Sequence, residues 1–446
     1  MISLNITKVT SEHFILFFLG IIVFVLAFTK TNFAIGILIF AMLLSPEISL
    51  GQMRERAVVL RVDDLLLLII FVAWLAKVSI FKELGLLKKT ILNIPIRNYI
   101  FVCLLATAIG LIMRQQSPAR SFFYILKYCE YFMLYFLVVN NIETKKEIKI
   151  FIMLMILTCF IVSIYGIYIH NTAGIRATAP FEGKEGEPNT LAGYLTLLMA
   201  MCMGLLFYVR SQAYFKTGLL IVLATAFFAM IFSLSRGGWL SFIFMYLAMI
   251  ALVSKYRAAL ILIGVFAIAL SPVIFPKEAK ERFHATFTPT AKSYKFKVMG
   301  KDVSIDESGS YRIVSLKAGF KQLADSPLIG HGVPTLALVD TQFMRVAMET
   351  GILGLFAFGF LLLRIFSAAR QALVSAIDDD DGFAQGVVIG YIAGFVGLLA
   401  HGFSAATFII VRIMEPFWML TAIVISIPFL CEAGKKEKDA PITEGT

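Results

Sequence analysis

The chain has 446 residues, of which 59% are hydrophobic and only 15% charged, and its mean hydropathy is +0.86. A soluble domain is nearer half apolar and a quarter charged, so this composition excludes an ordinary soluble protein. The net charge of +11 does not indicate nucleic-acid binding, because the basic residues of membrane proteins gather in cytoplasmic loops and suit anionic lipid head groups.

Thirteen apolar runs follow one another along the chain, most of them near the length that a helix needs to cross roughly 30 Å of hydrocarbon. They fall near 14–29, 32–46, 63–80, 97–113, 122–140, 149–169, 190–209, 216–234, 237–253, 257–275, 341–366, 383–401 and 404–431. The sequence therefore predicts an all-α fold, a polytopic transmembrane helical bundle of about 12 spans, with 13 as the alternative. We prefer twelve, with residues 14–46 crossing once or including a re-entrant piece.

Basic residues recur in alternate loops and in the C-terminal tail, which sets the orientation of the spans. This register places both termini inside and the long hydrophilic segment 276–340 outside. The acidic run at 378–381 falls in a cytoplasmic loop, where a solvated turn is expected. The predicted units are an N-terminal bundle (1–275), a periplasmic loop (276–340), C-terminal helices (341–431) and a cytoplasmic tail (432–446).

Charged residues at the outer ends of the predicted spans are candidates for a site. A charge at membrane depth is costly and is usually paired or functional. Arg236 lies in SLSRGG, a very short turn between two apolar runs, beside Gly237 and Gly238. Its planar guanidinium suits phosphate oxygens, and glycine permits a tight turn or the close approach of a ligand. An arginine that extends to lipid head groups is the alternative.

The segment DTQFMRVAMETG opens the eleventh run and carries Asp340, Arg345 and Glu349. Arg345 and Glu349 are four residues apart and share a helix face, and Asp340 lies where it could cap the N-terminus. These local roles suffice to explain the three residues, so a functional role is an open alternative. Asn189 likewise fits an ordinary helix start.

The sequence contains no Walker A, GxGxxG, GxSxG, HExxH or CxxC pattern. We therefore expect no ATP, dinucleotide or structural zinc, and no cofactor. The five cysteines all fall inside or at the edge of apolar runs, which does not indicate a disulfide framework.

Four stretches carry a family resemblance: RATAPFEGKEGEPNTLAGYL, SLSRGGWLSF, DSPLIGHGV and DTQFMRVAMETGILGLFAF. In order, they resemble an Arg and Pro-Asn segment, an S-x-SRG-x-W element, a D-x-PLxGxG turn and an HN-x-x-L…E-x-G-x-x-G signature of the O-antigen ligase and polymerase superfamily of bacterial inner-membrane proteins. One position departs: the ligases carry a His nine residues before the Glu, where this chain has Asp340. Members with Asp there look more like polymerases or less-characterised relatives.

The resemblance implies a metal-independent glycosyltransferase of cell-surface polysaccharide biosynthesis. It would move a glycan from undecaprenyl diphosphate to a sugar hydroxyl at the periplasmic face of the inner membrane. Such a donor is already activated, and arginines at the outer face could stabilise the leaving diphosphate. The candidate catalytic residues are Asp340 as base or acceptor-orienting group, Arg236 at the diphosphate and Glu349 orienting Arg345. The candidate substrate-binding residues are Arg176, Arg345, Arg120 and Asn189.

The implied partners are the lipid-linked glycan donor, a glycan or lipid-glycan acceptor, membrane lipids and other proteins of a polysaccharide assembly complex, without nucleic acid. Polymerase and ligase both remain open. So do two other classes of protein. A small-anion, bicarbonate-like transporter predicts charges near mid-membrane and broken helices in repeated positions. A non-catalytic scaffold predicts that polysaccharide output survives the loss of the outer arginines.

Overall fold

The computed structural model describes residues 18–53, 56–81, 87–182, 186–285, 294–298, 301–305, 307–335 and 339–439. Within them the chain is helical, and the predicted polytopic helical class is confirmed. Two short antiparallel hairpins interrupt it, β1 with β2 and β3 with β4. The strands are β1 (Glu47–Met53), β2 (Arg56–Arg61), β3 (Tyr294–Val298) and β4 (Lys301–Ile305).

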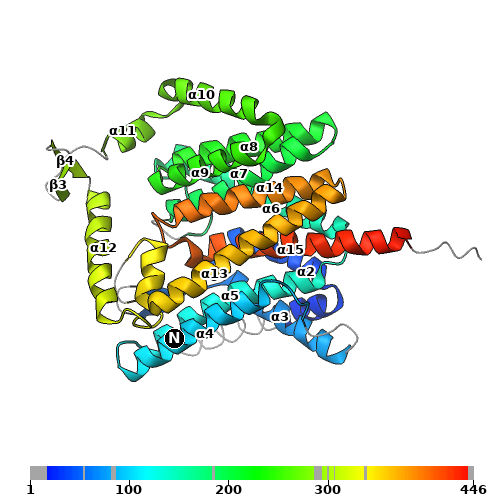
Figure 1. The fold of residues 1–446 in the computed structure, drawn as a ribbon, viewed down its shortest axis with the longest axis horizontal. Helices are drawn as coiled ribbons and strands as arrows, with labels where there is room; N and C mark the ends of the chain where they lie inside the picture. The colour runs from blue at the N-terminus through cyan, green and yellow to red at the C-terminus, as the bar shows by residue number, and fades with distance from the viewer. Residues whose placement is uncertain are drawn as a thin grey trace, which may run out of the picture.

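Nine helices of the described residues are long and apolar enough to cross a membrane. Together with the shorter or more polar ones, the labelled helices are α2 (Thr31–Leu44), α3 (Val62–Ile80), α4 (Asn93–Ile112), α5 (Pro118–Asn141), α6 (Lys145–Ala173), α7 (Pro188–Tyr208), α8 (Ala213–Phe232), α9 (Arg236–Leu252), α10 (Arg257–Ile274), α11 (Lys277–Ala285), α12 (Glu307–Asp325), α13 (Gln342–Asp378), α14 (Gly382–His401) and α15 (Val411–Asp439). The apolar helices lie side by side, and α12 runs across one end of the bundle (Figure 1). We call that end the α12 end and the opposite one, where α15 ends, the tail end.

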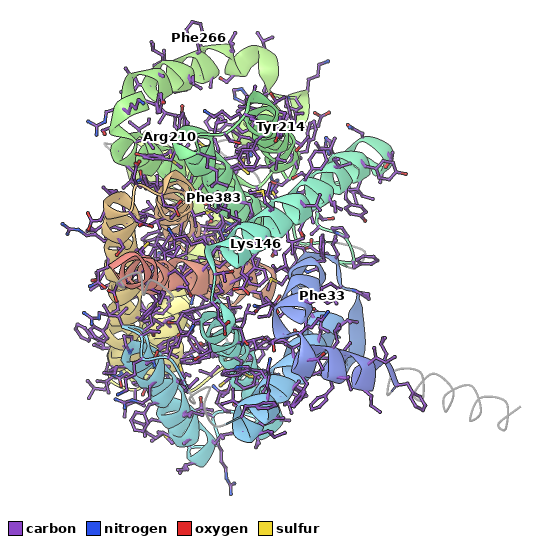
Figure 2. The ribbon with its side chains drawn as sticks, turned by 90° about the vertical axis from the view of Figure 1, so that its right-hand side faces the viewer. Phe33, Lys146, Arg210, Tyr214, Phe266 and Phe383 are labelled. Atoms are coloured by element: carbon purple, nitrogen blue, oxygen red, sulfur yellow. The ribbon has the colours of Figure 1, made fainter. Side chains whose placement is uncertain are left out.

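The centre of the bundle is formed by α7 and α14, which pack backbone to backbone. A Cβ on Gly204 would lie 2.1 Å from the carbonyl oxygen of Gly386, so only glycine allows this approach. Small residues are typical where membrane helices pack this closely. At the other extreme only 6% of the α10 span is buried, and Phe266 on that helix points away from the bundle (Figure 2). The tightly packed α7 and α14 therefore hold the groups at their ends in fixed positions.

Residues 14–46 do not cross once, as preferred from the sequence. Their described part forms two short helices, Phe18–Thr29 and α2, which reverse at Lys30. Phe28 packs against Phe81 at the end of α3, and Asn32 donates a 2.6 Å hydrogen bond to Glu147 at the start of α6, so the turn lies at the tail end. A single crossing is therefore wrong for the described residues, whereas a re-entrant piece and two crossings both fit a hairpin of two short helices.

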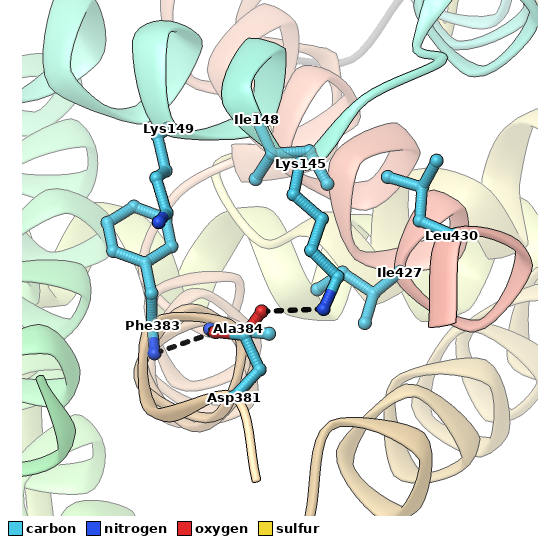
Figure 3. A pocket seen from close by; sticks show the side chains of 8 residues that line it. All are labelled: Lys145, Ile148, Lys149, Asp381, Phe383, Ala384, Ile427 and Leu430. Atoms are coloured by element: carbon cyan, nitrogen blue, oxygen red, sulfur yellow. Dashed lines mark hydrogen bonds and ion pairs between the residues drawn. The ribbon is translucent and has the colours of Figure 1, made fainter. Parts of the chain in front are cut away.

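The acidic run at the tail end is not a simple solvated turn. Lys145 at the start of α6 binds Asp379 and, at 3.0 Å, Asp381, whose side chains are only 17% and 18% exposed. Asp381 also accepts hydrogen bonds from the backbone N–H groups of Phe383 and Ala384, which caps α14 (Figure 3). The expectation holds for Asp378 and Asp380, which are exposed. It was wrong for Asp379 and Asp381, because their ion-pair partner lies more than two hundred residues away in the sequence.

Candidate functional site

The SLSRGG stretch forms the predicted short turn at the α12 end, between α8 and α9. Ser235 is the N-cap of α9, and its hydroxyl oxygen accepts a 3.1 Å hydrogen bond from the N–H of Gly238. The same hydroxyl donates to the side-chain oxygen of Asn189 at 2.7 Å. Arg236 is thus the first residue of α9, and the start of α9 is hydrogen-bonded to Asn189 in the first turn of α7.

Gly237 and Gly238 are explained by helix packing. A Cβ on Gly237 would lie 2.1 Å from the hydroxyl oxygen of Ser404, and one on Gly238 would lie 2.3 Å from the Cβ of Ala192. Both glycines have ordinary helical backbone angles, so they are needed for close contact with α7 and with the turn after α14. The arginine that precedes them is held at a fixed height on the end of the bundle.

Three arginines gather around this turn. Arg176 donates hydrogen bonds to the carbonyl oxygens of Ser233, at 2.8 Å, and Leu234, at 3.2 Å. Partial burial and the positive charges of Arg282 and Arg236 lower the pKa of Arg176 to about 10, and no carboxylate of the described residues is among the groups that shift it. Like charges held close together favour the binding of an anion. We call Arg176, Arg236 and Arg282 the arginine cluster.

Asp340 lies just before α13 with its side chain 47% exposed, and it does not cap the helix. Thr341 occupies the N-cap position without a side-chain cap bond. Instead, the Asp340 carboxylate faces Arg312 of α12, whose Nε lies 3.7 Å away. The capping interpretation is therefore wrong, and Asp340 is an accessible carboxylate beside a cation.

The DSPLIGHGV stretch fits into a break in α13. Gly351 has a φ of +65°, which interrupts the helix, and the N–H groups of His331 and Gly332 bond the carbonyls of Met348 and Glu349 at 2.9 Å. A Cβ on Gly330, whose φ is +73°, would lie 2.6 Å from the backbone of Glu349. Gly330 and Gly351 are thus both required by the backbone-to-backbone contact between the two stretches. This contact supplies hydrogen-bond partners to the carbonyl groups that the break in α13 leaves open.

Glu349 is 1% exposed and joins three parts of the fold. Its carboxylate accepts hydrogen bonds from Arg345 Nε at 2.9 Å, from the Tyr128 hydroxyl at 2.9 Å and from the Thr335 N–H at 3.2 Å. The predicted i,i+4 pair of Arg345 and Glu349 is present. Arg345 is itself 6% exposed and lies over the ring of Tyr124. Both side chains are held inside the protein, away from solvent.

The predicted residues thus divide into three groups. Arg176, Arg236 and Asn189 come together, and Asp340 lies across the turn after α14 from them. Arg345 and Glu349 form a separate buried pair. Arg120 is half-buried in the first turn of α5 and has no hydrogen bond or ion pair with the described residues. Sequence reasoning missed Arg282 and Arg312, because in the hydrophilic segment 276–340 no spacing rule distinguishes them from other basic residues.

A second group of charges is buried between α3, α5 and α15. It consists of Arg61, Asp63, Asp64, Lys127, Glu130 and Glu415. Asp63 and Glu415 are 0% exposed, and neither carboxylate oxygen of Glu415 has a hydrogen-bond partner among the described residues. Oxygens of Asp63, Asp64 and Glu415 lie within 4.8 Å of one another, as metal ligands would. Arg61 and Lys127, however, already form ion pairs with all three of these carboxylates, so internal ion pairs account for the group.

The region that contains the SLSRGG turn and the break in α13 matches a protein-family model. Residues 219–359 match the O-antigen ligase family. The match runs from α8 into α13 and contains three of the four stretches that carry the resemblance. It confirms the resemblance to the O-antigen ligase and polymerase superfamily and supports a role in polysaccharide biosynthesis. The search of curated proteins finds no match to this chain.

Proposed function

We propose that this protein transfers a glycan from undecaprenyl diphosphate to an acceptor hydroxyl at the outer face of the bacterial inner membrane. The observation that carries the proposal is the arginine cluster, in which the pKa of Arg176 is lowered to about 10 by partial burial and two neighbouring cations. A diphosphate would relieve this repulsion. Its charge grows as the glycosidic bond breaks, so the cluster would bind the transition state more tightly than the substrate.

The residues divide between donor and acceptor in this proposal. Arg176, Arg236 and Arg282 hold the diphosphate, and Asn189 keeps the Arg236 turn in place through Ser235. Asp340 orients the acceptor hydroxyl and takes its proton, because its side chain is 47% exposed and only loosely paired at 3.7 Å with Arg312. Glu349 and Arg345 support the fold of α13. No nucleotide is required, since the lipid diphosphate is itself the leaving group.

A transfer assay with purified protein tests the proposal. The protein is reconstituted with a polyprenyl-diphosphate glycan and an acceptor oligosaccharide, and the product is followed by mass spectrometry. We expect transfer by the wild type and a loss of at least about a hundredfold in Arg236→Gln, since oxyanion-type contacts contribute roughly 10²–10³ in rate. Wild-type rates in Arg236→Gln would contradict the proposal. The products also separate a polymerase, which extends repeat units, from a ligase, which caps a lipid-linked acceptor.

A transporter is the second candidate, and one specific observation favours it. Lys127 and Glu130 lie well inside α5, and with Glu415 they belong to the buried charged group. Ionisable residues at membrane depth mark ion or proton paths in many transporters. A liposome flux assay with bicarbonate and other small anions decides: uptake that requires Glu415 and no glycan transfer would establish transport, whereas transfer without uptake would exclude it.

A further inference from the structure

The turn at residues 402–405 connects the two halves of the proposed site. On one side, Gly237 of the α9 first turn lies so close to Ser404 that a Cβ would be 2.1 Å from its hydroxyl oxygen. On the other, the N–H of Gln342 donates a 2.8 Å hydrogen bond to the carbonyl of Gly402. The turn therefore lies between Arg236, one residue before Gly237, and Asp340, two residues before Gln342.

Phe403 is the exposed aromatic residue of this turn. Its side chain is 65% exposed, and its ring contacts that of Phe343 with centroids 4.8 Å apart. The backbone beneath it is fixed, because the N–H of Phe403 bonds the Ala400 carbonyl at 3.2 Å and the Ser404 N–H bonds the His401 carbonyl at 2.8 Å. A large apolar ring is thus presented on a rigid support instead of being packed into the bundle.

We propose that Phe403 is the platform on which the acceptor sugar stacks, a role that rests on the proposed glycan transfer. A pyranose carries hydroxyls at its edge and weakly positive C–H groups on its face, which complement the negative face of an aromatic ring. Such a ring offers contact area with only two side-chain torsions to fix. The contact to Phe343, three residues after Asp340, places the platform on the acceptor side of the turn. A sugar stacked there lies between the carboxylate and the arginine cluster.

The competing role for an exposed aromatic residue at a helix end is an anchor among lipid head groups. The two roles differ in what they require of the side chain. An anchor needs apolar area, which leucine also provides, whereas stacking needs a flat ring. Phe122 in the first turns of α5 is also 65% exposed. It serves as the matched control for the loss of an exposed ring.

The first test compares Phe403→Leu, Phe403→Tyr and Phe122→Leu in the reconstituted transfer assay. For Phe403→Leu we expect kcat/KM for the acceptor to fall about tenfold, since an aromatic stacking contact contributes roughly that factor, while the KM for the lipid-linked donor stays unchanged. Phe403→Tyr should retain wild-type values within about twofold. Equal losses in Phe403→Leu and Phe122→Leu, no loss in Phe403→Leu, or a loss in Phe403→Tyr as large as in Phe403→Leu would overturn the proposal.

The second test measures binding without turnover, so that it does not depend on the transfer reaction. Phe403→Trp is titrated with oligosaccharides released from the surface polysaccharide of the producing strain, and tryptophan emission is followed against the wild type, which has three tryptophans. We expect a saturable change that inorganic pyrophosphate does not abolish. No saturable change would overturn the platform even if transfer is observed, and saturation without any transfer would contradict the proposed function alone.

Discussion

Ser235 donates a 2.7 Å hydrogen bond to the side chain of Asn189, and this bond joins the N-terminal turns of α9 and α7. Two stretches separated by 46 residues are thereby held at one level of the bundle. Arg236 follows directly, so the position of its guanidinium depends on a neutral amide that has no role in charge balance. Under the proposed function, Asn189 would act on the donor site through Ser235.

Replacing Asn189 tests this dependence. Asn189→Ala removes the acceptor of the Ser235 hydroxyl, so we expect a fall of several-fold in transfer and a stability loss of about 1 kcal/mol, typical of one hydrogen bond. Asn141→Ala is the control, because Asn141 bonds the Leu137 carbonyl within its own helix at the tail end. If both variants transfer glycan equally well, the bond does not position Arg236.

The glycines at the break in α13 should be intolerant of alanine. Gly351→Ala places a Cβ 2.4 Å from the backbone of Leu328 at a φ of +65°, so we expect destabilisation of at least about 1–3 kcal/mol. At Gly359, farther along α13, a Cβ would meet no heavy atom of a described neighbouring element within 4 Å. Gly359→Ala should therefore be neutral or stabilising by up to about 1 kcal/mol. Thermal unfolding in one detergent compares the two, and equal melting temperatures would contradict the account.

The Arg345–Glu349 pair is expected to matter for stability more than for chemistry. Glu349→Gln leaves a buried guanidinium uncompensated and should cost about 3–5 kcal/mol. The double variant Arg345→Met with Glu349→Leu removes both charges and should regain most of this loss. Denaturation curves of the wild type and the two variants check the prediction. Should the stable double variant lose all transfer activity, Glu349 or Arg345 has a catalytic role after all.

The arginine cluster should destabilise the protein in the absence of substrate. Because the pKa of Arg176 is lowered to about 10, its protonated form is disfavoured on folding, and this cost is present at neutral pH and relieved as pH rises above 10. We expect the melting temperature of the wild type to rise with salt, which screens the cluster, and that of Arg176→Gln to rise less. The comparison across salt is needed because the variant also loses the hydrogen bonds to Ser233 and Leu234 at every salt concentration. Added pyrophosphate should stabilise the wild type more than Arg176→Gln. The same dependence on salt and pyrophosphate in both proteins would refute this reasoning.

Asp340 and Arg312 can be separated by exchanging their charges. Asp340→Asn should lose transfer if the carboxylate takes a proton, whereas Asp340→His, which restores the residue type of the ligases, should keep part of it. The exchange Asp340→Arg with Arg312→Asp restores the ion pair between α12 and α13 without a carboxylate at 340. Compared with either single substitution, we expect the exchange to restore the resistance of α12 to protease but not the transfer of glycan. Recovered transfer would reduce Asp340 to a structural role.

Spacing along the sequence predicted those contacts that are local in the fold. The helical bundle, the short SLSRGG turn and the pair of Arg345 with Glu349 follow from hydropathy runs and helical periodicity. Asp340 shows where such reasoning stops. Its position suggested an N-cap, but its partner Arg312 lies on a helix that crosses the end of the bundle, and no local rule encodes that crossing.

The glycines show a second limit. Gly237 and Gly238 suggested room for a ligand beside Arg236, whereas their hydrogens face Ser404 and Ala192. A glycine that permits a tight turn and one that permits close helix packing look alike in a sequence. Arg282 and Phe403 have no motif of their own, so only the three-dimensional arrangement brings them to the proposed site.

The most direct test of the account is the affinity for undecaprenyl diphosphate. Wild type, the double variant Arg176→Gln with Arg236→Gln, and the control Arg257→Gln at the tail end are reconstituted in nanodiscs, and binding of the lipid is measured against undecaprenol, which has no phosphate. We predict that the double variant loses at least about tenfold in affinity for the diphosphate, because charge-assisted bonds are lost, and that the control binds as the wild type. Equal affinity in all three proteins, or equal binding of undecaprenol, would contradict the central claim.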